Sequence, residues 1–314
     1  MTVSSELVEL VSRELQEPVP EGAMVLARSL VRADAERGAI DAILFYGSNF
    51  RRRDDREGVL DFYVLVRGYG AYYGRLALAF ANWLLPPNVF YVEQSRDGET
   101  LRAKYAVVSV EKFRRSVSER AFHPYFWARF SQPCALLYAR DAQARRTVTV
   151  ALAEAVRTFV VRSLPLVPEE FSSRELWVAG FRASYGTELR SEREDVAEKL
   201  FAAAPARYRE VTGLVAPAAG LERLGADRFR SRLSRLARSR GRWAWRARAW
   251  LGKGLSLLRI LKGWVTFRGG VDYVLWKIER HSGIRADRKL LEGRFRIVGL
   301  ARVFWDLFRR GAFR

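Results

Sequence analysis

Two short stretches of the chain carry residue types that could handle phosphate. An apolar run, residues 42–46, ends in the Gly47-Ser48 turn, and a second run, residues 62–66, follows the carboxylate of Asp61. A glycine turn lets backbone N–H groups approach phosphate oxygens, and a carboxylate on a neighbouring strand can hold Mg²⁺. An acid that opens an apolar run is costly to bury unless it is paired or bound to a cation. The two features together indicate nucleotide chemistry, whereas a Gly-Ser turn alone is typical of ordinary strand ends.

This strand–turn–strand layout resembles the beginning of polymerase-β-type nucleotidyltransferases. Twelve residues separate Ser48 from Asp61, which suits two adjacent strands joined by a short basic loop. Tyr63 stands where many such enzymes carry a second carboxylate. A second metal-binding carboxylate would therefore have to come from another part of the chain.

Five further blocks, in a fixed order, make a more specific resemblance. They are Pro87–Tyr91, Lys104–Ser109, Ala128–Pro133, Ser184–Arg190, and Leu261–Gly270 with Tyr273 and Lys277. With the turn at Tyr46, these blocks resemble the mitochondrial translocator assembly and maintenance family, the soluble-type phosphatidate cytidylyltransferases. The resemblance covers Tyr46 to about Gly213 and resumes at Leu261. Members of that family are similar to polymerase-β-type nucleotidyltransferases followed by a winged-helix-like domain, and they make CDP-diacylglycerol from CTP and phosphatidic acid with Mg²⁺.

The resemblance implies roles for individual residues. Gly47 and Ser48 would cradle the triphosphate, Asp61 would bind the metal, and Lys104 would neutralise phosphate charge. Glu188 stands where the family usually has Asp, and it is our first candidate for the second metal ligand, with Glu93 behind it. Substrate-binding roles are implied for Tyr91, Arg129, Gln132 and Arg190.

Each of these residues also has a purely structural interpretation. Lys104 could be an exposed charge at a strand edge, Arg129 an ion-pair residue beside an aromatic cluster, and Glu188 a residue that caps a helix. Asn49 replaces the family's glycine after Gly-Ser, and Asn tolerates left-handed backbone better than most residues, so the turn can persist.

Composition limits the chemistry and indicates an anionic partner. The only cysteine, Cys134, excludes a disulfide framework, and two histidines are too few to suggest a histidine metal site. Residues 221–314 hold 25 basic and 7 acidic residues and thus most of the net charge of +20. No apolar run is long enough to span a bilayer, because the best one, residues 76–92, is interrupted by Asn and Pro. The N-terminus has no targeting pattern, which predicts a mature start.

Hydrophobic periodicity predicts an α+β fold in three parts. A nucleotidyltransferase core is expected over residues 1–135, a helical winged-helix-like domain over 136–220, and a basic amphipathic region over 221–314. The core should begin with helices within 4–38. Strands are expected at 41–46, 59–67, 88–95 and 101–109, and helices at 71–85, 113–119, 141–164, 172–183, 192–202 and 205–212.

The basic region interleaves arginine with Trp, Leu and Phe, as in Arg242, Trp243, Trp245 and Arg246. Helices with an apolar face and a cationic face fit a membrane interface. The leading hypothesis is thus a peripheral phosphatidate cytidylyltransferase at the cytoplasmic face of an inner membrane, with CTP, phosphatidic acid and Mg²⁺ as its small partners. Basic residues with aromatics also fit nucleic acid, so an RNA- or tRNA-directed nucleotidyltransferase is an alternative. A non-catalytic module that binds anionic lipid is another.

Overall fold

The computed structural model describes residues 3–53, 58–96, 99–188 and 196–266. The chain begins with two helices, α1 (Ser5–Glu14) and α2 (Glu21–Ala33), separated by the prolines at 18 and 20. Ser4 caps α1 by accepting a hydrogen bond from the N–H of Leu7. The two predicted helices of the N-terminal segment are therefore confirmed.

A five-stranded mixed sheet forms the centre of the first half. Its strands are β1 (Ile40–Tyr46), β2 (Leu60–Val66), β3 (Asn88–Arg96), β4 (Glu99–Ser109) and β5 (Ala135–Ala139), in the order β3-β4-β2-β1-β5. Neighbours are antiparallel except β2 and β4, which are parallel. The four predicted strands are confirmed, and β5 was not predicted. The predicted boundary at 135/136 falls inside β5, so the sheet extends past it.

Both faces of the sheet are buried. On one face α2 and the aromatic residues of α4 (Tyr69–Tyr73) pack on β1, β2 and β4. On the other face, α1, α6 (Val110–Val117), α7 (Trp127–Phe130) and α8 (Ala142–Ser163) form a core that continues into the helical half. Because side chains alternate along a strand, Asp61 and Tyr63 project toward this second face. The polar residues of interest therefore share one side of the sheet.

The predicted helix over 71–85 is wrong in one respect. Two helices occur there, α4 and α5 (Leu76–Leu84), and Gly74 separates them with a φ of 58°. This left-handed backbone favours glycine and ends α4. Residues 47–52, expected as part of a basic loop, form the short helix α3 (Gly47–Arg52).

The second half is mainly helical. It contains α8, η1 (Leu164–Leu166), α9 (Ser173–Tyr185), α10 (Val196–Ala202) and α11 (Pro205–Val215), close to the predicted helices. A small sheet, β6-β8-β7, joins β6 (Glu170–Ser172), β7 (Leu221–Arg223) and β8 (Arg228–Ser231). The basic region predicted from 221 thus begins with two strands that belong to the folded body.

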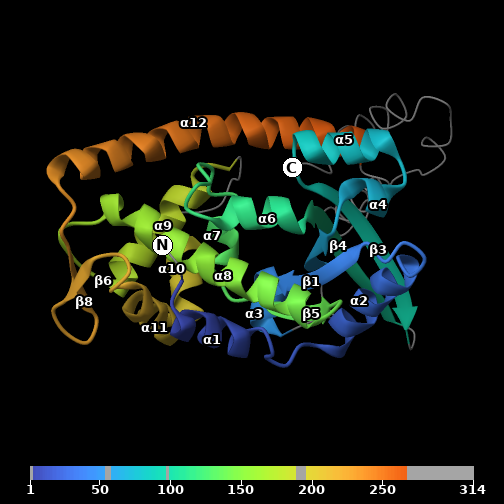
Figure 1. Ribbon diagram of the computed structural model, residues 1–314, viewed down its shortest axis with the longest axis horizontal. Coiled ribbons are helices and arrows are strands. Elements are labelled where there is room, and N and C mark those ends of the chain that lie inside the picture. The colour runs from blue at the N-terminus through green and yellow to red at the C-terminus, as the bar shows by residue number, and fades with distance from the viewer. Residues whose placement is uncertain (1–2, 54–57, 97–98, 189–195, 267–314) are drawn as a thin grey trace, which may run out of the picture.

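A single long helix, α12 (Arg235–Thr266), runs along the molecule from the helical half to the sheet half, in orange at the top of Figure 1. Gly241 lies against Pro165 near its start, and Trp245 Nε1 donates to the carbonyl of Arg162 at 2.8 Å. Arg259 Nε donates to the carbonyl of Pro86 at 3.2 Å near its end. The helix therefore holds the two halves together. Among the described residues, no helix is long and apolar enough to cross a membrane.

Candidate functional site

The Gly47 turn lies directly against Asp61. Tyr46, the last residue of β1, pairs with Asp61 in the β1–β2 register. Gly47 has a φ of 93°, and a Cβ atom placed on it would lie 2.8 Å from Asp61 Oδ2. Both the backbone conformation and the carboxylate thus require glycine here. The two sequence features that predicted phosphate chemistry meet in the fold.

Asp61 forms an ion pair with Lys104. These residues are partners in the parallel β2–β4 register, and Lys104 Nζ lies 2.9 Å from Asp61 Oδ1. The Asp61 side chain is 16% exposed and that of Lys104 is 40% exposed. Tyr91 is the β3 partner of Lys104, and its hydroxyl donates to Glu93 Oε2 at 3.1 Å. The strand register therefore assembles a pair that solvent and small ligands can reach.

The helix that follows the turn is held by its own side chains. Ser48 Oγ donates to Asn49 Oδ1 at 3.4 Å, and Arg52 Nη2 donates to the same oxygen at 2.8 Å. Arg51 Nη1 donates to Gln132 Oε1 at 3.3 Å, which links α3 to the chain after α7. Asn49 lies within α3, so the left-handed conformation considered for it is wrong; Gly47 adopts it instead.

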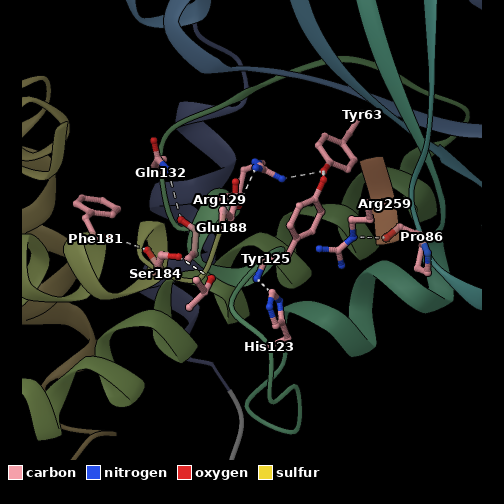
Figure 2. A network of polar contacts seen from close by, with 12 residues as sticks. Tyr63, Pro86, His123, Tyr125, Arg129, Gln132, Phe181, Ser184, Glu188 and Arg259 are labelled. Carbon is pink, nitrogen blue, oxygen red and sulfur yellow. Dashed lines mark hydrogen bonds and ion pairs between the residues drawn. The ribbon is translucent and has the colours of Figure 1, made fainter. Parts of the chain in front are cut away.

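A second group of polar residues is centred on Arg129 (Figure 2). Arg129 Nη1 donates to the Tyr63 hydroxyl at 3.1 Å, and Nη2 donates to Glu188 Oε1 at 3.2 Å. The guanidinium carbon lies 4.4 Å from the centre of the Tyr125 ring. The Arg129 and Glu188 side chains are only 13% and 17% exposed. A charged pair this enclosed needs the surrounding hydrogen bonds and aromatic faces.

Burial and charge set the protonation states of this cluster. Burial raises the pKa of Tyr63 well above its ordinary value, and the neighbouring Tyr125 adds to the rise. Burial alone would lower the pKa of Arg129, but Tyr63, Tyr125 and Glu188 outweigh it and raise that pKa. Arg129 is therefore a permanent cation, and Tyr63 is a neutral phenol that accepts its hydrogen bond.

The end of α12 closes the open side of this cluster. The Arg259 guanidinium carbon lies 3.9 Å from the Tyr125 ring centre. Lys262 Nζ donates to the carbonyl of Pro87 at 2.8 Å and also to that of Leu85. Burial, with Arg259 nearby, lowers the pKa of Lys262 to about 8. Arg259 and Lys262 thus lie on α12 and donate hydrogen bonds to the loop that leads into β3.

His123 lies beside the same cluster. Its Nδ1 accepts a hydrogen bond from the backbone N–H of Tyr125 at 3.2 Å. A Cβ atom on Gly252 would lie 2.7 Å from its Nε2, so α12 approaches the ring closely. Burial, and then the charge of Arg259, lower the pKa of His123 to about 4. The ring is therefore neutral at pH 7, and we assign His123 a structural role.

The predicted Mg²⁺ ligands are not brought into one donor set by the described residues. Asp61 contacts Lys104, and Glu188 contacts Arg129. In the part of the chain that the structure describes, no three His, Cys, Asp or Glu side chains form a group that could hold a metal. Tyr63, in the place of a second carboxylate, is bonded to Arg129 instead. These residues do not by themselves fit a Mg²⁺ site, and Mg²⁺ stays a prediction.

The structure thus divides the predicted residues into two groups. Gly47 and Ser48 follow the end of β1, and Asp61 lies at the start of β2. Lys104 is the register partner of Asp61 in β4, and Tyr91 is the partner of Lys104 in β3. Arg129 and Glu188 form the enclosed pair, Gln132 contacts α3, and Arg190 lies outside the described residues.

Two residues of the enclosed cluster were not predicted, Tyr125 and Arg259. The aromatic run at 125–127 beside Arg129 was a visible signal for the first. No sequence pattern indicated a role for Arg259, because nothing in the sequence shows that a helix from the basic region contacts a loop about 170 positions earlier.

Comparisons with known proteins add little. No family model and no curated protein matches the chain. One solved structure it is similar to is a nucleotidyltransferase-like protein from Exiguobacterium sibiricum, with 12% identity over 92% of each chain and a TM-score of 0.26.

Proposed function

We propose that this chain is a nucleotidyltransferase that transfers CMP from CTP to phosphatidic acid, giving CDP-diacylglycerol and pyrophosphate. The observation that carries the transferase proposal is the contact between the Gly47 turn and the accessible Asp61–Lys104 pair. The choice of CTP and phosphatidic acid rests on the ordered sequence blocks.

The proposed reaction needs few protein groups. A phosphate monoester has a second pKa of about 6 and is largely ionised near neutrality, so its oxygen can attack without a general base. That oxygen forms a bond to the α-phosphorus of CTP, while the bond from this phosphorus to the bridging oxygen breaks and pyrophosphate leaves. Catalysis then depends on alignment and on charge neutralisation.

The residues at the turn suit that task. Gly47 has no side chain and a φ of 93°, so the turn can pass close to Asp61. The half-exposed Lys104 ammonium can neutralise phosphate charge, and Asp61 fixes its position on the sheet. Asp61 is also the residue through which Mg²⁺ would be held under this proposal.

The outer face of α12 supports a membrane location for the acceptor. Leu236, Trp243, Trp250 and Leu257 recur every seven residues and are 61%, 64%, 83% and 51% exposed. A seven-residue repeat keeps side chains on nearly the same face of a helix. The sequence of α12 holds arginines and lysines and no acid, and each well-placed cation adds about 1 kcal/mol on an anionic membrane. We propose that residues 221–314 bind an anionic membrane surface through this helix.

The test is an assay with labelled CTP and vesicles that contain phosphatidate, followed by lipid extraction. Labelled CDP-diacylglycerol should form with Mg²⁺ present and fall when EDTA is added. Asp61→Asn should lower the rate about 100-fold or more, because it removes a positioned charge at the reacting phosphate. Asp141→Asn, at the cap of α8, is a control of equal charge change that should keep the activity. Full activity in Asp61→Asn would refute the site.

One observation favours a second candidate, a non-catalytic module that binds anionic lipid. Tyr63 occupies the place of the second carboxylate and is bonded to Arg129. A protein of this kind would bind the vesicles and yield no labelled lipid with any nucleoside triphosphate.

A further inference from the structure

Helix α5 presents an apolar face to solvent. Leu76, Phe80, Trp83 and Leu84 are 87%, 61%, 65% and 65% exposed. They are spaced by four, three and one residues and therefore share one side of a helix. The rings of Phe80 and Trp83 stack on each other, with centroids 5.8 Å apart. Exposed apolar side chains gathered in this way indicate an interaction surface.

The opposite side of α5 is fixed to the sheet. Asn82 is fully buried, and its Nδ2 donates to the carbonyl of Val107 and to the Tyr73 hydroxyl, both at 2.9 Å. Its Oδ1 accepts from the N–H of Asn88 at 2.8 Å. The buried amide thus fixes the rotation of the helix and keeps the apolar side outward. The exposure is built into the fold.

The end of α12 lies next to α5, in the region where the two helices overlap in Figure 1. Lys262 donates to the carbonyls of Leu85 and Pro87, and Arg259 to that of Pro86, directly after α5. Exposed Leu257 and Leu258 directly precede Arg259 in α12. The apolar face of α5 and the apolar row of α12 are thereby joined at the turn between α5 and β3.

Charge identifies the partner. Helix α5 has no charged residue, whereas α12 has exposed Arg242, Arg246 and Lys253 beside its apolar row. An apolar centre with flanking cations matches the interface of an anionic bilayer, where Trp also concentrates. A surface that binds another protein would instead be expected to have an apolar centre surrounded by a mixed polar rim.

We propose that α5 is a membrane-inserting element, which enters the headgroup region of an anionic bilayer while α12 lies on the surface beside it. The proposal extends beyond residues 221–314, because α5 belongs to the sheet half of the molecule. It rests on exposure and charge and does not require the proposed transfer reaction.

The chain offers a specific label for the test, because its single cysteine, Cys134, is buried, and burial raises its thiol pKa to about 12. The variant Phe80→Cys is labelled with an environment-sensitive fluorophore, and Val150→Cys, at an exposed position of α8, serves as the matched control. Vesicles of phosphatidylcholine with 30% phosphatidate, a composition of about one anionic lipid in three, should raise and blue-shift the emission at position 80 only. Vesicles of phosphatidylcholine alone should give a much smaller change.

A second measurement uses the unlabelled full chain. Phe80→Ser with Trp83→Ser should weaken vesicle co-sedimentation about tenfold or more, whereas Val150→Ser should change it less than twofold. Folding of the double variant is checked by circular dichroism. If the proposed transferase activity is correct, the double variant should still convert a short-chain, water-soluble phosphatidate. The two experiments therefore distinguish a failure of the membrane-binding proposal from a failure of the proposed transferase.

Three results would overturn the proposal. The first is unchanged vesicle binding by the double variant. The second is emission at position 80 that changes with protein concentration and not with vesicles, which would make the face a contact between copies of the chain. The third is failure of Phe80→Cys to react with a maleimide in the absence of vesicles, which would mean that another part of the chain covers the face.

Discussion

The molecule contains two ion pairs on the same side of one sheet, and they differ in how exposed the cation is, whereas the two carboxylates are about equally enclosed. Asp61–Lys104 has a lysine that is 40% exposed, whereas both members of Arg129–Glu188 are less than 20% exposed. Arg129 also contacts Tyr63 and the Tyr125 ring. The first pair can exchange its partner for a ligand at little cost, and the second cannot. Charge alone therefore does not identify a site for chemistry; access to solvent separates the two.

The largest expected effect comes from breaking the enclosed pair. Arg129→Met leaves Glu188 buried without its cation and should lower the free energy of unfolding by about 3–5 kcal/mol. Urea unfolding measures the loss. The double variant Arg129→Met with Glu188→Gln should recover at least about 1 kcal/mol of it, because the unpaired charge is gone. No recovery would contradict the assigned pair.

Acid should act on the same cluster through His123. Its pKa is about 4 in the fold and 6.5 without it, so the unfolded chain binds more protons between these values and stability falls as the pH drops from about 6.5 to 4. At 1.36 kcal/mol per pKa unit, the loss is at most about 3–4 kcal/mol. His123→Asn keeps an acceptor for the Tyr125 N–H, and its unfolding free energy should depend less on pH in this window. An equal pH dependence of the unfolding free energy in both proteins would show that His123 is not its cause.

The next test substitutes Gly47, which lies against Asp61 of the accessible pair. Gly47→Ala puts a Cβ 2.8 Å from Asp61 Oδ2 at a φ of 93° and should cost about 2 kcal/mol of unfolding free energy. Gly70→Ala is the control, because nothing lies within 4 Å of its added Cβ and its φ is not positive. Chemical denaturation of both should show a loss for the first only.

Lys104→Met should have the smallest effect on stability, about 1 kcal/mol, because the Lys104 side chain is 40% exposed, although Asp61 is only 16% exposed. Its effect on transfer of labelled CMP should nevertheless be large if Lys104 contacts phosphate. Arg115→Met breaks another exposed pair, with Glu111, and should leave the activity intact. A large loss of stability in Lys104→Met would erase the contrast between the two pairs.

The sequence predicted the local elements well and their long-range contacts poorly. Alternating apolar residues located four of the five strands of the central sheet, and the short strands β6, β7 and β8 were not predicted. The Gly47–Asp61 contact followed from two adjacent strands. The strand β5 was missed because its run Ala-Leu-Leu-Tyr-Ala lies between helical segments and lacks β-branched residues. The Arg129–Glu188 pair had no local pattern, since its members come from separate helical regions. The contact of α12 with residues 85–87 was equally invisible.

The long reach of α12 has a consequence for how the protein is made. Its contacts join Arg248 to Phe122 and Arg259 to Pro86, so the helix meets partners translated far earlier. Because chains fold from the N-terminus during synthesis, the sheet half and the helical half have to form before α12 can pack across them. A product that ends near residue 234 would keep every strand that the structure describes and lose the contacts that α12 makes with residues 86 and 122. Synthesis of α12 therefore adds the last contacts between two halves that already share a hydrophobic core.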